Sequence, residues 1–375
     1  MRPETEAELA EMISAAKGPL HVRGGGTRQV GAASAGAVLE TGGLSGVTLY
    51  EPGALTLVVR AGTPLAEVEA ALAEDNQRLA FEPMDHRGLL GTQGEPTIGG
   101  VVAANVSGPR RIQAGACRDF LLGVRFVDGS GTVLKNGGRV MKNVTGYDLV
   151  KLMAGSWGTL GVLSEVSLKV LPQPETAACI LIDGLSDAEA VTAMAQALGS
   201  PYEVTGAAHA PVGIDGYPVT MLRIEGFADS VKYRAGALCD LFSGHAVRAE
   251  HDPEAVAKGW RWVRDVELLH DRPGDVWRIS CKPSDAPGLT AALKAEALLY
   301  DWGGGLIWAL LPEGTDARKR LGAFGGHATL VRGSEASRRA LGVFHPEPPA
   351  VAALSDGLRK RFDPRGILNP GLMSA

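Results

Sequence analysis

Cysteine is scarce in this chain of 375 residues, and its four occurrences stand far apart in the sequence, at Cys117, Cys179, Cys239 and Cys281. No two of them form a Cys-x-x-Cys pair, which argues against a zinc ribbon, an iron–sulfur cluster or a disulfide framework. A metal centre for electron transfer would therefore have to lie in another chain.

Long apolar runs and an excess of one charge are also missing. No apolar run approaches the ~18 residues of a membrane-spanning helix, and the first residues, MRPETEAELAEM, are too acidic for a signal peptide. The 37 basic and 42 acidic residues are mixed along the chain, without the basic stripe of a nucleic-acid-binding protein. We expect a cytoplasmic protein that binds no nucleic acid and reaches the inner membrane only peripherally, through partner proteins.

Glycine, by contrast, is abundant, with 50 residues, about twice what average usage would give. It is concentrated in three loops, RGGGTRQVG (23–31), TIGGVVAANVSGP (97–109) and GSWGTLGV (155–162). Each loop borders a predicted strand or helix, where backbone N–H groups are free and a side chain would block a ligand. One such loop could be an ordinary turn. Three in one segment favour a shared ligand with a pyrophosphate, which needs exposed N–H donors.

The spacing of these glycines excludes two common phosphate cradles. Gln29 stands where the third glycine of a Rossmann Gly-x-Gly-x-x-Gly motif should be, and the chain has no Gly-x-x-x-x-Gly-Lys-Ser/Thr motif. The sequence therefore predicts a different dinucleotide fold. In that fold we expect a positive φ at Gly25, and a side chain added there would obstruct the pyrophosphate.

Hydrophobic patterning places a domain boundary near the middle of the chain. Apolar residues mark strands at 55–62 and 163–170, and Pro172 and Pro174 stop the second strand. We therefore expect one compact unit to end there and a second one to follow.

The second segment repeats strand–helix–strand units, for example a strand at 276–283, a helix at 289–299 and a strand at 306–312. Such layers are typical of an α+β fold rather than a doubly wound parallel sheet. We predict a first domain at 1–172, a second α+β domain at 173–345, and a C-terminal helix and tail at 346–375 that return to the first domain.

Five motifs occur along the chain in a fixed order: VRGGGT, TIGGVVAANVSGP, RDFLLGVRFVDGSG, KNVTGYDLVKLMAGSWGTLGVLSEVSLKV and FDPRGILNPG. In this order they resemble the FAD-binding enzymes of the vanillyl-alcohol oxidase / p-cresol methylhydroxylase type, over about residues 20 to 172 and the tail. Within that family the chain is similar to the D-2-hydroxyacid dehydrogenase branch, and most of all to FAD-binding subunits of glycolate oxidase (glycolate dehydrogenase). The resemblance implies a two-part FAD-binding domain of the p-cresol methylhydroxylase type with an α+β cap domain.

The resemblance also assigns the residues that would hold FAD. The first loop would surround the pyrophosphate, the other two would border the rest of the cofactor, and the tail would approach the flavin. The predicted contacts are Arg23, Gly24, Gly25, Gly26, Thr27, Arg28, Thr97, Ile98, Gly99, Gly100, Asn105, Gly155, Ser156, Thr159, Gly161, Val162 and Asn369. No histidine or cysteine lies in the triple-glycine loop, so we expect FAD to be bound without a covalent link.

The function implied is that of a FAD-binding subunit supporting oxidation of glycolate and D-lactate-like 2-hydroxyacids to 2-oxoacids. Its partners would be a related FAD-dependent catalytic subunit and an iron–sulfur subunit that receives the electrons. Catalytic chains of this branch use histidines and an acid around a metal, together with arginines for the carboxylate. Here FGGHATLVRG provides only His327 and Arg332, so these are the catalytic candidates and no metal site is expected.

Three alternatives stay open at this point. His327 alone is also compatible with a histidine satisfied inside the core. The chain could be an assembly subunit that keeps the FAD fold without substrate chemistry, or an independent D-2-hydroxyacid dehydrogenase.

Overall fold

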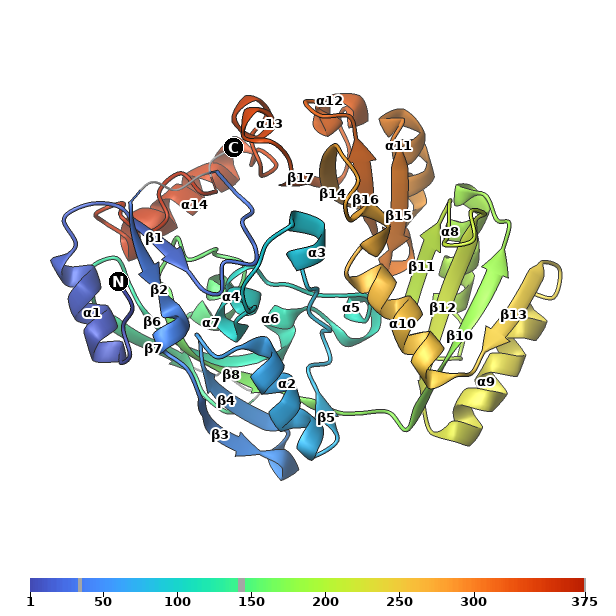
Figure 1. Cartoon of the computed structure of the whole chain (residues 1–375), viewed down its shortest axis with the longest axis horizontal. Helices are drawn as coiled ribbons and strands as arrows, with labels where there is room; N and C mark the ends of the chain where they lie inside the picture. The colour runs from blue at the N-terminus through green and yellow to red at the C-terminus, as the bar shows by residue number, and fades with distance from the viewer. Residues whose placement is uncertain (33–35, 141–145, 374–375) are drawn as a thin grey trace.

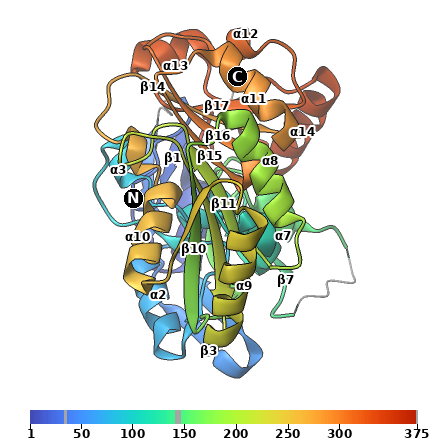
Figure 2. The same ribbon diagram turned by 90° about the vertical axis from the view of Figure 1, so that its right-hand side faces the viewer.

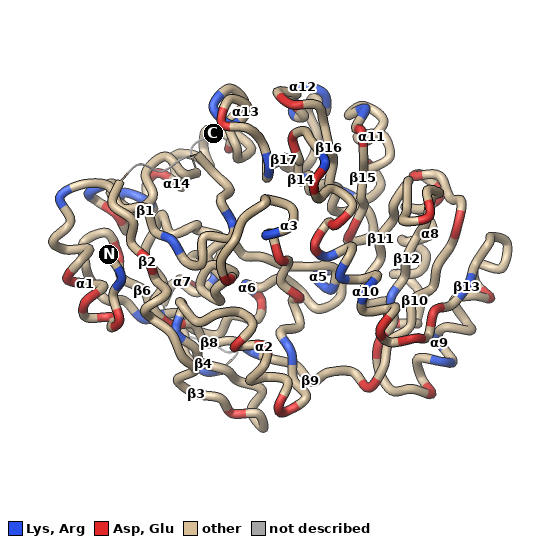
Figure 3. The backbone as a smooth tube through the Cα atoms, viewed as in Figure 1, with Lys and Arg blue, Asp and Glu red and all other residues tan. Residues whose placement is uncertain are grey.

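The computed structural model describes residues 1–32, 36–140 and 146–373, so residues 142–145 of the KNVTGYD motif lie outside it. The chain forms two halves, each built on an antiparallel sheet (Figure 1). Acidic and basic residues are interspersed over both halves (Figure 3), as the mixed charges in the sequence predict. The mixture of helices and antiparallel sheets confirms the predicted α+β class.

The first half surrounds a five-stranded sheet with the strand order β3-β4-β8-β6-β7. Strands β4 and β8 are buried along most of their length because both faces of the sheet are covered. A parallel pair, β1 and β2, lies beside it. The strands are β1 Leu20–Arg23, β2 Ala37–Glu40, β3 Val47–Glu51, β4 Thr56–Arg60, β5 Gln77–Arg78, β6 Leu121–Val127, β7 Val133–Gly137, β8 Val162–Lys169 and β9 Leu171–Pro172. The helices are α1 Glu6–Ala15, α2 Leu65–Glu74, α3 Arg87–Leu90, α4 Ile98–Ala103, α5 Arg111–Ala114, α6 Cys117–Phe120 and α7 Leu149–Met153.

The second half is an eight-stranded antiparallel sheet with the order β13-β10-β12-β11-β15-β16-β14-β17. Its strands are β10 Thr176–Asp183, β11 Gly206–Ala210, β12 Val219–Gly226, β13 Ala246–Glu250, β14 Asp275–Cys281, β15 Ala297–Asp301, β16 Leu306–Leu311 and β17 Gly326–Arg332. Its helices, with those that follow the sheet, are α8 Asp187–Leu198, α9 Ala228–Leu241, α10 Pro253–Arg264, α11 Ala286–Leu293, α12 Ala317–Leu321, α13 Glu335–Leu341 and α14 Pro349–Phe362. Helices α8 and α9 cover one face and α10 covers the other (Figure 2).

Strand β16 shows how this sheet joins the two halves. Its alternate residues Leu306, Trp308 and Leu310 belong to the hydrophobic core shared with the first half, while the residues between them pack under the helices of the second half. Side chains of a strand alternate between its faces, so one strand contributes to both cores. The two halves therefore share a continuous core rather than meeting at a wet surface.

The helix predicted at 289–299 is too long, and this prediction is wrong in its second part. Helix α11 ends at Leu293, Lys294 adopts a left-handed conformation with φ of +48°, and residues 297–301 form strand β15. Alanine, leucine and glutamate favour helix locally. Pairing with β16 and complete burial of Leu299 outweigh that preference.

The segment after α14 packs on the first half. Arg365 donates hydrogen bonds to the carbonyl oxygens of Gly129 and Ile13, and Leu368 forms a β-bridge with Leu20. The tail thus lies beside β1, close to where the triple-glycine loop begins.

Candidate functional site

A cleft in the first half is lined by the triple-glycine loop, the start of α4, the loop before β8 and the tail. It brings together most of the residues predicted to hold a dinucleotide, although the first and the last of them, Arg23 and Asn369, are more than 300 positions apart in the sequence. The predicted residues on its wall are Arg23, Gly24, Gly25, Gly26, Thr27, Arg28, Thr97, Gly99, Gly100, Gly161, Val162 and Asn369.

The structure gives a different reason for the glycines than the sequence suggested. A Cβ at Gly25 would lie 1.6 Å from the carbonyl oxygen of Glu95, and one at Gly24 would lie 2.5 Å from Thr97 Oγ1. The positive φ, +71°, occurs at Gly26 and not at Gly25. The loop is therefore free of side chains because it packs against residues 94–97 of the protein itself, and this packing leaves its backbone facing the cleft.

Five of the predicted contacts lie elsewhere. Ile98 is completely buried in the core. The hydroxyls of Ser156 and Thr159 are buried and donate to carbonyl oxygens within their own loop. Asn105 and Gly155 line an adjacent cavity instead of the cleft. Ile98, Ser156 and Thr159 thus pack behind the cleft wall and do not face the cleft.

Asn369 connects three parts of the cleft wall. Its Oδ1 accepts a hydrogen bond from the Val22 N–H at 2.8 Å, and its Nδ2 donates to the carbonyl oxygen of Trp157 at 2.9 Å. Through these two hydrogen bonds Asn369 shapes the cleft, because it holds β1 and the loop before β8 together.

A second cavity of about 340 Å³ adjoins the cleft, and the two share Arg28, Ala104 and Trp157 on their walls. This size is in the range of small-molecule sites. Both halves contribute to it. The polar and aromatic residues on its wall are Arg28, His86, Asn105, Ser107, Arg111 and Trp157 from the first half and Arg278, Trp308, His327, Thr329 and Phe344 from the second half and the segments after its sheet.

Strand alternation explains why the second half presents basic groups here. On β14, Trp277 and Ile279 point into the core under the helices, so Arg278 between them points toward the first half. On β17, Ala328 and Leu330 are buried in the same core, which turns His327 to the cavity. One face of the sheet therefore forms the cavity wall.

The cavity is strongly basic. Arg111 and Arg278 lie over the ring of Trp302, with guanidinium-to-ring distances of 4.5 and 5.1 Å. Neither forms an ion pair with a carboxylate of the described residues. Burial lowers the pKa of both Arg28 and Arg278 to about 10, so both remain cations at neutral pH. A ligand with negative charge would offset their desolvation.

The two catalytic candidates have different fates in the structure. His327 is on the cavity wall, so it is not a core histidine. Burial and the charges of Arg278, His345 and Arg111 lower its pKa, so the ring is neutral at neutral pH. Arg332 is not brought to the cavity, because its guanidinium donates to the carbonyl oxygens of Leu89, Leu269 and Arg272.

His86 forms a pair with Arg28. Arg28 Nε lies 3.2 Å from His86 Nδ1, and Arg28 Nη1 donates to the carbonyl oxygen of Gly100 at 2.9 Å. This pair stands at the junction of the cleft and the second cavity, where both cavities include Arg28.

Other wall residues were missed by sequence reasoning. His21 lines the cleft, and its buried Nδ1 has no hydrogen-bond partner among the described residues. Arg111 follows the second glycine loop directly, which is a usable signal. Arg278 has no such signal, because its direction depends on which face of the sheet meets the first half.

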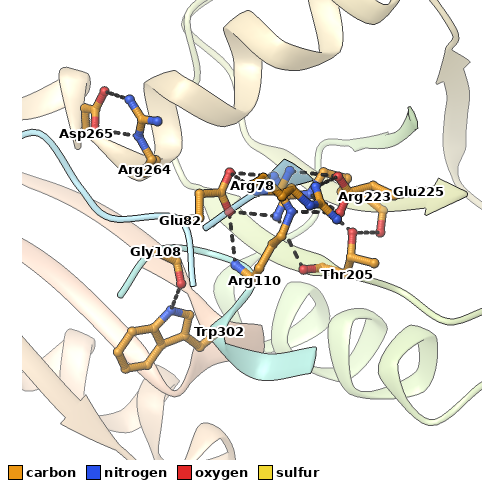
Figure 4. Close-up of polar contacts among 10 residues, drawn as sticks. All are labelled: Arg78, Glu82, Gly108, Arg110, Thr205, Arg223, Glu225, Arg264, Asp265 and Trp302. Atoms are coloured by element: carbon orange, nitrogen blue, oxygen red, sulfur yellow. Dashed lines mark hydrogen bonds and ion pairs between the residues drawn. The ribbon is translucent and has the colours of Figure 1, made fainter. Parts of the chain in front are cut away.

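Buried ion pairs join the halves beside this site (Figure 4). We call Arg78, Glu82, Arg110, Arg223 and Glu225 the interdomain ion cluster. Glu82 of the first half accepts from both Nη atoms of Arg223 at 3.0 Å, and Glu225 of the second half accepts from Arg78 and Arg110 at 2.7–2.9 Å. Burial alone would raise the pKa of Glu82 and Glu225, but the neighbouring arginines outweigh it, and both pKa values are lowered.

Two further observations concern the described residues only. They contain no group of three or more histidine, cysteine, aspartate or glutamate side chains arranged to hold a metal ion. No helix among them has the length and apolar character needed to cross a membrane.

Comparison with known proteins gives the family of the chain. Residues 1–137 match the FAD binding domain family. The chain is 36% identical over 373 residues to the glycolate oxidase subunit GlcE of Escherichia coli (strain K12), covering 98% of this chain and 97% of that protein. It is 41% identical over 85 residues to the glycolate oxidase subunit GlcD of Bacillus subtilis (strain 168), covering 23% and 18% of the two proteins.

Among solved structures, an alkyldihydroxyacetonephosphate synthase matches with a TM-score of 0.71 and 18% identity, covering 99% of this chain and 76% of the other. At this identity the likeness shows the fold alone. The family match and the identity to the glycolate oxidase subunit show that the chain is a FAD-dependent oxidoreductase of the p-cresol methylhydroxylase type. Identity along nearly its whole length further shows that the chain belongs to the family of the glycolate oxidase subunit GlcE.

Proposed function

We propose that this chain is the FAD-binding subunit of a multi-subunit glycolate oxidase and supports oxidation of glycolate and D-lactate-like 2-hydroxyacids to 2-oxoacids. The observation that carries the proposal is the second cavity. It opens from the cofactor cleft, and its arginines have no carboxylate partner among the described residues.

The cleft fits FAD because it offers backbone rather than side chains. The backbone of residues 24–26 offers N–H groups suited to a pyrophosphate, whereas the N–H groups of Ile98, Gly99 and Gly100 already donate to Thr63, Ala61 and Thr97. The unpartnered Nδ1 of His21 can bond to a polar group of the ligand. When bound, FAD supplies the acceptor for the hydride. Arg28 and Trp157, which line both cavities, would contact the part of FAD next to the second cavity.

The residues of the second cavity suit a small hydroxyacid. Arg278 and Arg111 are placed to hold its carboxylate, a role in which Arg278 replaces the predicted Arg332 because the latter is bonded to carbonyl groups. His327, neutral at physiological pH, can accept the proton of the substrate hydroxyl.

Partner chains complete the proposed enzyme. The relative from Escherichia coli is named as one subunit of a glycolate oxidase, and the relative from Bacillus subtilis as another. We include an iron–sulfur subunit as the electron acceptor, since the four cysteines of this chain are unpaired and scattered. We therefore expect robust turnover only in the complex.

The test is dye-coupled oxidation of glycolate and D-lactate, first by the isolated yellow chain and then by the chain co-expressed with both partners. Robust turnover by the isolated chain would favour the independent dehydrogenase. The same complex carrying Arg278→Met should lose at least tenfold in kcat/KM for glycolate. Unchanged activity of that complex would favour the assembly subunit.

Acid precipitation tests the mode of cofactor binding. We expect free FAD in the supernatant, because the loop residues 23–28 include no histidine or cysteine. Colour that stays with the precipitate would point to a covalent bond, with His21 on the cleft wall as the first residue to replace.

A further inference from the structure

His86 stands where the two cavities meet, on the helix α3 side of the junction. It is only 8% exposed, precedes α3 directly and forms part of the wall of the second cavity. In Figure 1, α3 lies between the two halves. A polar ring at this place contacts whatever binds between the cofactor cleft and the sheet of the second half.

The contact with Arg28 determines which ring nitrogen carries the proton. An arginine guanidinium can only donate hydrogen bonds, so His86 Nδ1, 3.2 Å from Arg28 Nε, must present its lone pair. The carbonyl oxygen of Met84 lies 3.3 Å from the same nitrogen, but two acceptors do not bond to each other. Arg28 cannot turn away easily, because its Nη1 is bonded to the Gly100 carbonyl oxygen.

A ring with Nδ1 as acceptor is neutral and carries its proton on Nε2. Burial and the charge of Arg28 lower the pKa of His86 well below its usual value, which keeps the ring neutral. Nε2 forms no hydrogen bond with the described residues and is not among their enclosed, unpartnered atoms. It is therefore available to a ligand in the cavity.

We infer that His86 is a neutral hydrogen-bond donor, held in one tautomer by Arg28, that binds an oxygen atom of a 2-hydroxyacid or 2-oxoacid in the second cavity. It does not act as the base, because Nε2 already holds a proton. The two histidines of the cavity thus have separate roles, with His86 as donor and His327 as acceptor. The ligand class rests on the proposed function; the tautomer does not.

Two substitutions separate the nitrogens of the ring. Glutamine can place an amide N–H near the position of Nε2, whereas asparagine can place an oxygen near Nδ1 and leaves no donor in the cavity. We expect His86→Gln to bind oxalate within about threefold of the wild-type holoprotein. His86→Asn should bind it at least tenfold more weakly, as loss of a hydrogen bond to a charged group predicts. Oxalate binding is read from the change in flavin absorbance, and FAD content should match wild type in both variants.

Nitrogen NMR of the histidine-labelled holoprotein tests the tautomer directly, with the His86 signals assigned by their loss in the variants. We expect a protonated Nε2 and an unprotonated Nδ1 from about pH 6 to about pH 8. A protonated Nδ1, or oxalate binding by His86→Asn as tight as wild type, would overturn the inference. Failure of the wild-type holoprotein to bind oxalate at all would instead count against the proposed function.

Discussion

Replacing Gly100 with alanine should separate cofactor binding from folding. Gly100 is on the cleft wall at the third position of α4, and a Cβ there would meet Thr97 Oγ1 at 3.2 Å and Arg28 Nη1 at 3.9 Å, both on the same wall. Alanine in a helix is favoured over glycine by up to about 1 kcal/mol, and the close contact with Thr97 reduces this gain in stability. The apoprotein should therefore be as stable as wild type or up to about 1 kcal/mol more stable. FAD, in contrast, loses the close approach to the backbone, and we expect its affinity to fall at least tenfold, or about 1.4 kcal/mol.

The assay is the free energy of unfolding of the apoprotein in urea together with the dissociation constant of FAD from flavin fluorescence. Gly236 in α9 provides the matched control, because an added Cβ there meets no described atom within 4 Å. Gly236→Ala should gain about 1 kcal/mol and bind FAD like wild type. Wild-type FAD affinity in Gly100→Ala would refute the placement of the cofactor. Gly25 is a poor probe for this purpose, since a side chain there collides with the Glu95 carbonyl oxygen whether or not FAD is present.

Three further predictions concern buried charges. Glu82→Gln removes the carboxylate that lies 3.0 Å from buried Arg223 and leaves it only the more distant Glu225, at 3.7 Å, so it should lower the free energy of unfolding by about 3–5 kcal/mol. Glu335→Gln, in an exposed pair, should change the free energy of unfolding by less than about 1 kcal/mol. The pKa values of Glu82 and Glu225 are lowered in the folded state. The stabilisation from these two carboxylates is therefore present above the unfolded pKa of about 4.3 and is lost as the pH falls through the folded values. Urea titrations below pH ~5 should show that the free energy of unfolding falls less steeply with pH in Glu225→Gln than in wild type. For Asp301 the pH dependence is reversed. Burial raises its pKa to about 7, so the folded state binds the proton more tightly and the free energy of unfolding should fall as the pH rises from ~4 to 7. Asp301→Asn should remove this dependence on pH.

Much of the first half could be predicted from the sequence because its signals are local. The predicted strand at 55–62 contains β4, and the predicted strand at 163–170 overlaps β8 except for one residue at each end. The glycine loops also gave most of the cleft wall, since exposed backbone is a property of the loop itself. The FAD-binding class was confirmed by the family match over residues 1–137.

What could not be predicted depends on contacts between distant segments. The alanine- and leucine-rich stretch around Leu299 becomes a strand only because β11 and β16 lie on either side of it. Arg332 looked like a free cation, but three carbonyl groups from other segments surround it. Arg278 was missed because nothing near it in the sequence shows which face of β14 turns toward the first half.

The hydrogen bonds of Asn369 can form only near the end of synthesis of the chain. The walls that this side chain joins, β1 and the loop at Trp157, are synthesised long before it, and the whole second half is made in between. Domains generally fold in sequence order during synthesis, but the cleft lacks the two hydrogen bonds of Asn369 until the tail has been synthesised. Loading of the cofactor into a finished cleft therefore has to wait for the second half. A chain interrupted between residues 162 and 369 would contain the glycine loops but not the residue that holds β1 and the loop at Trp157 together.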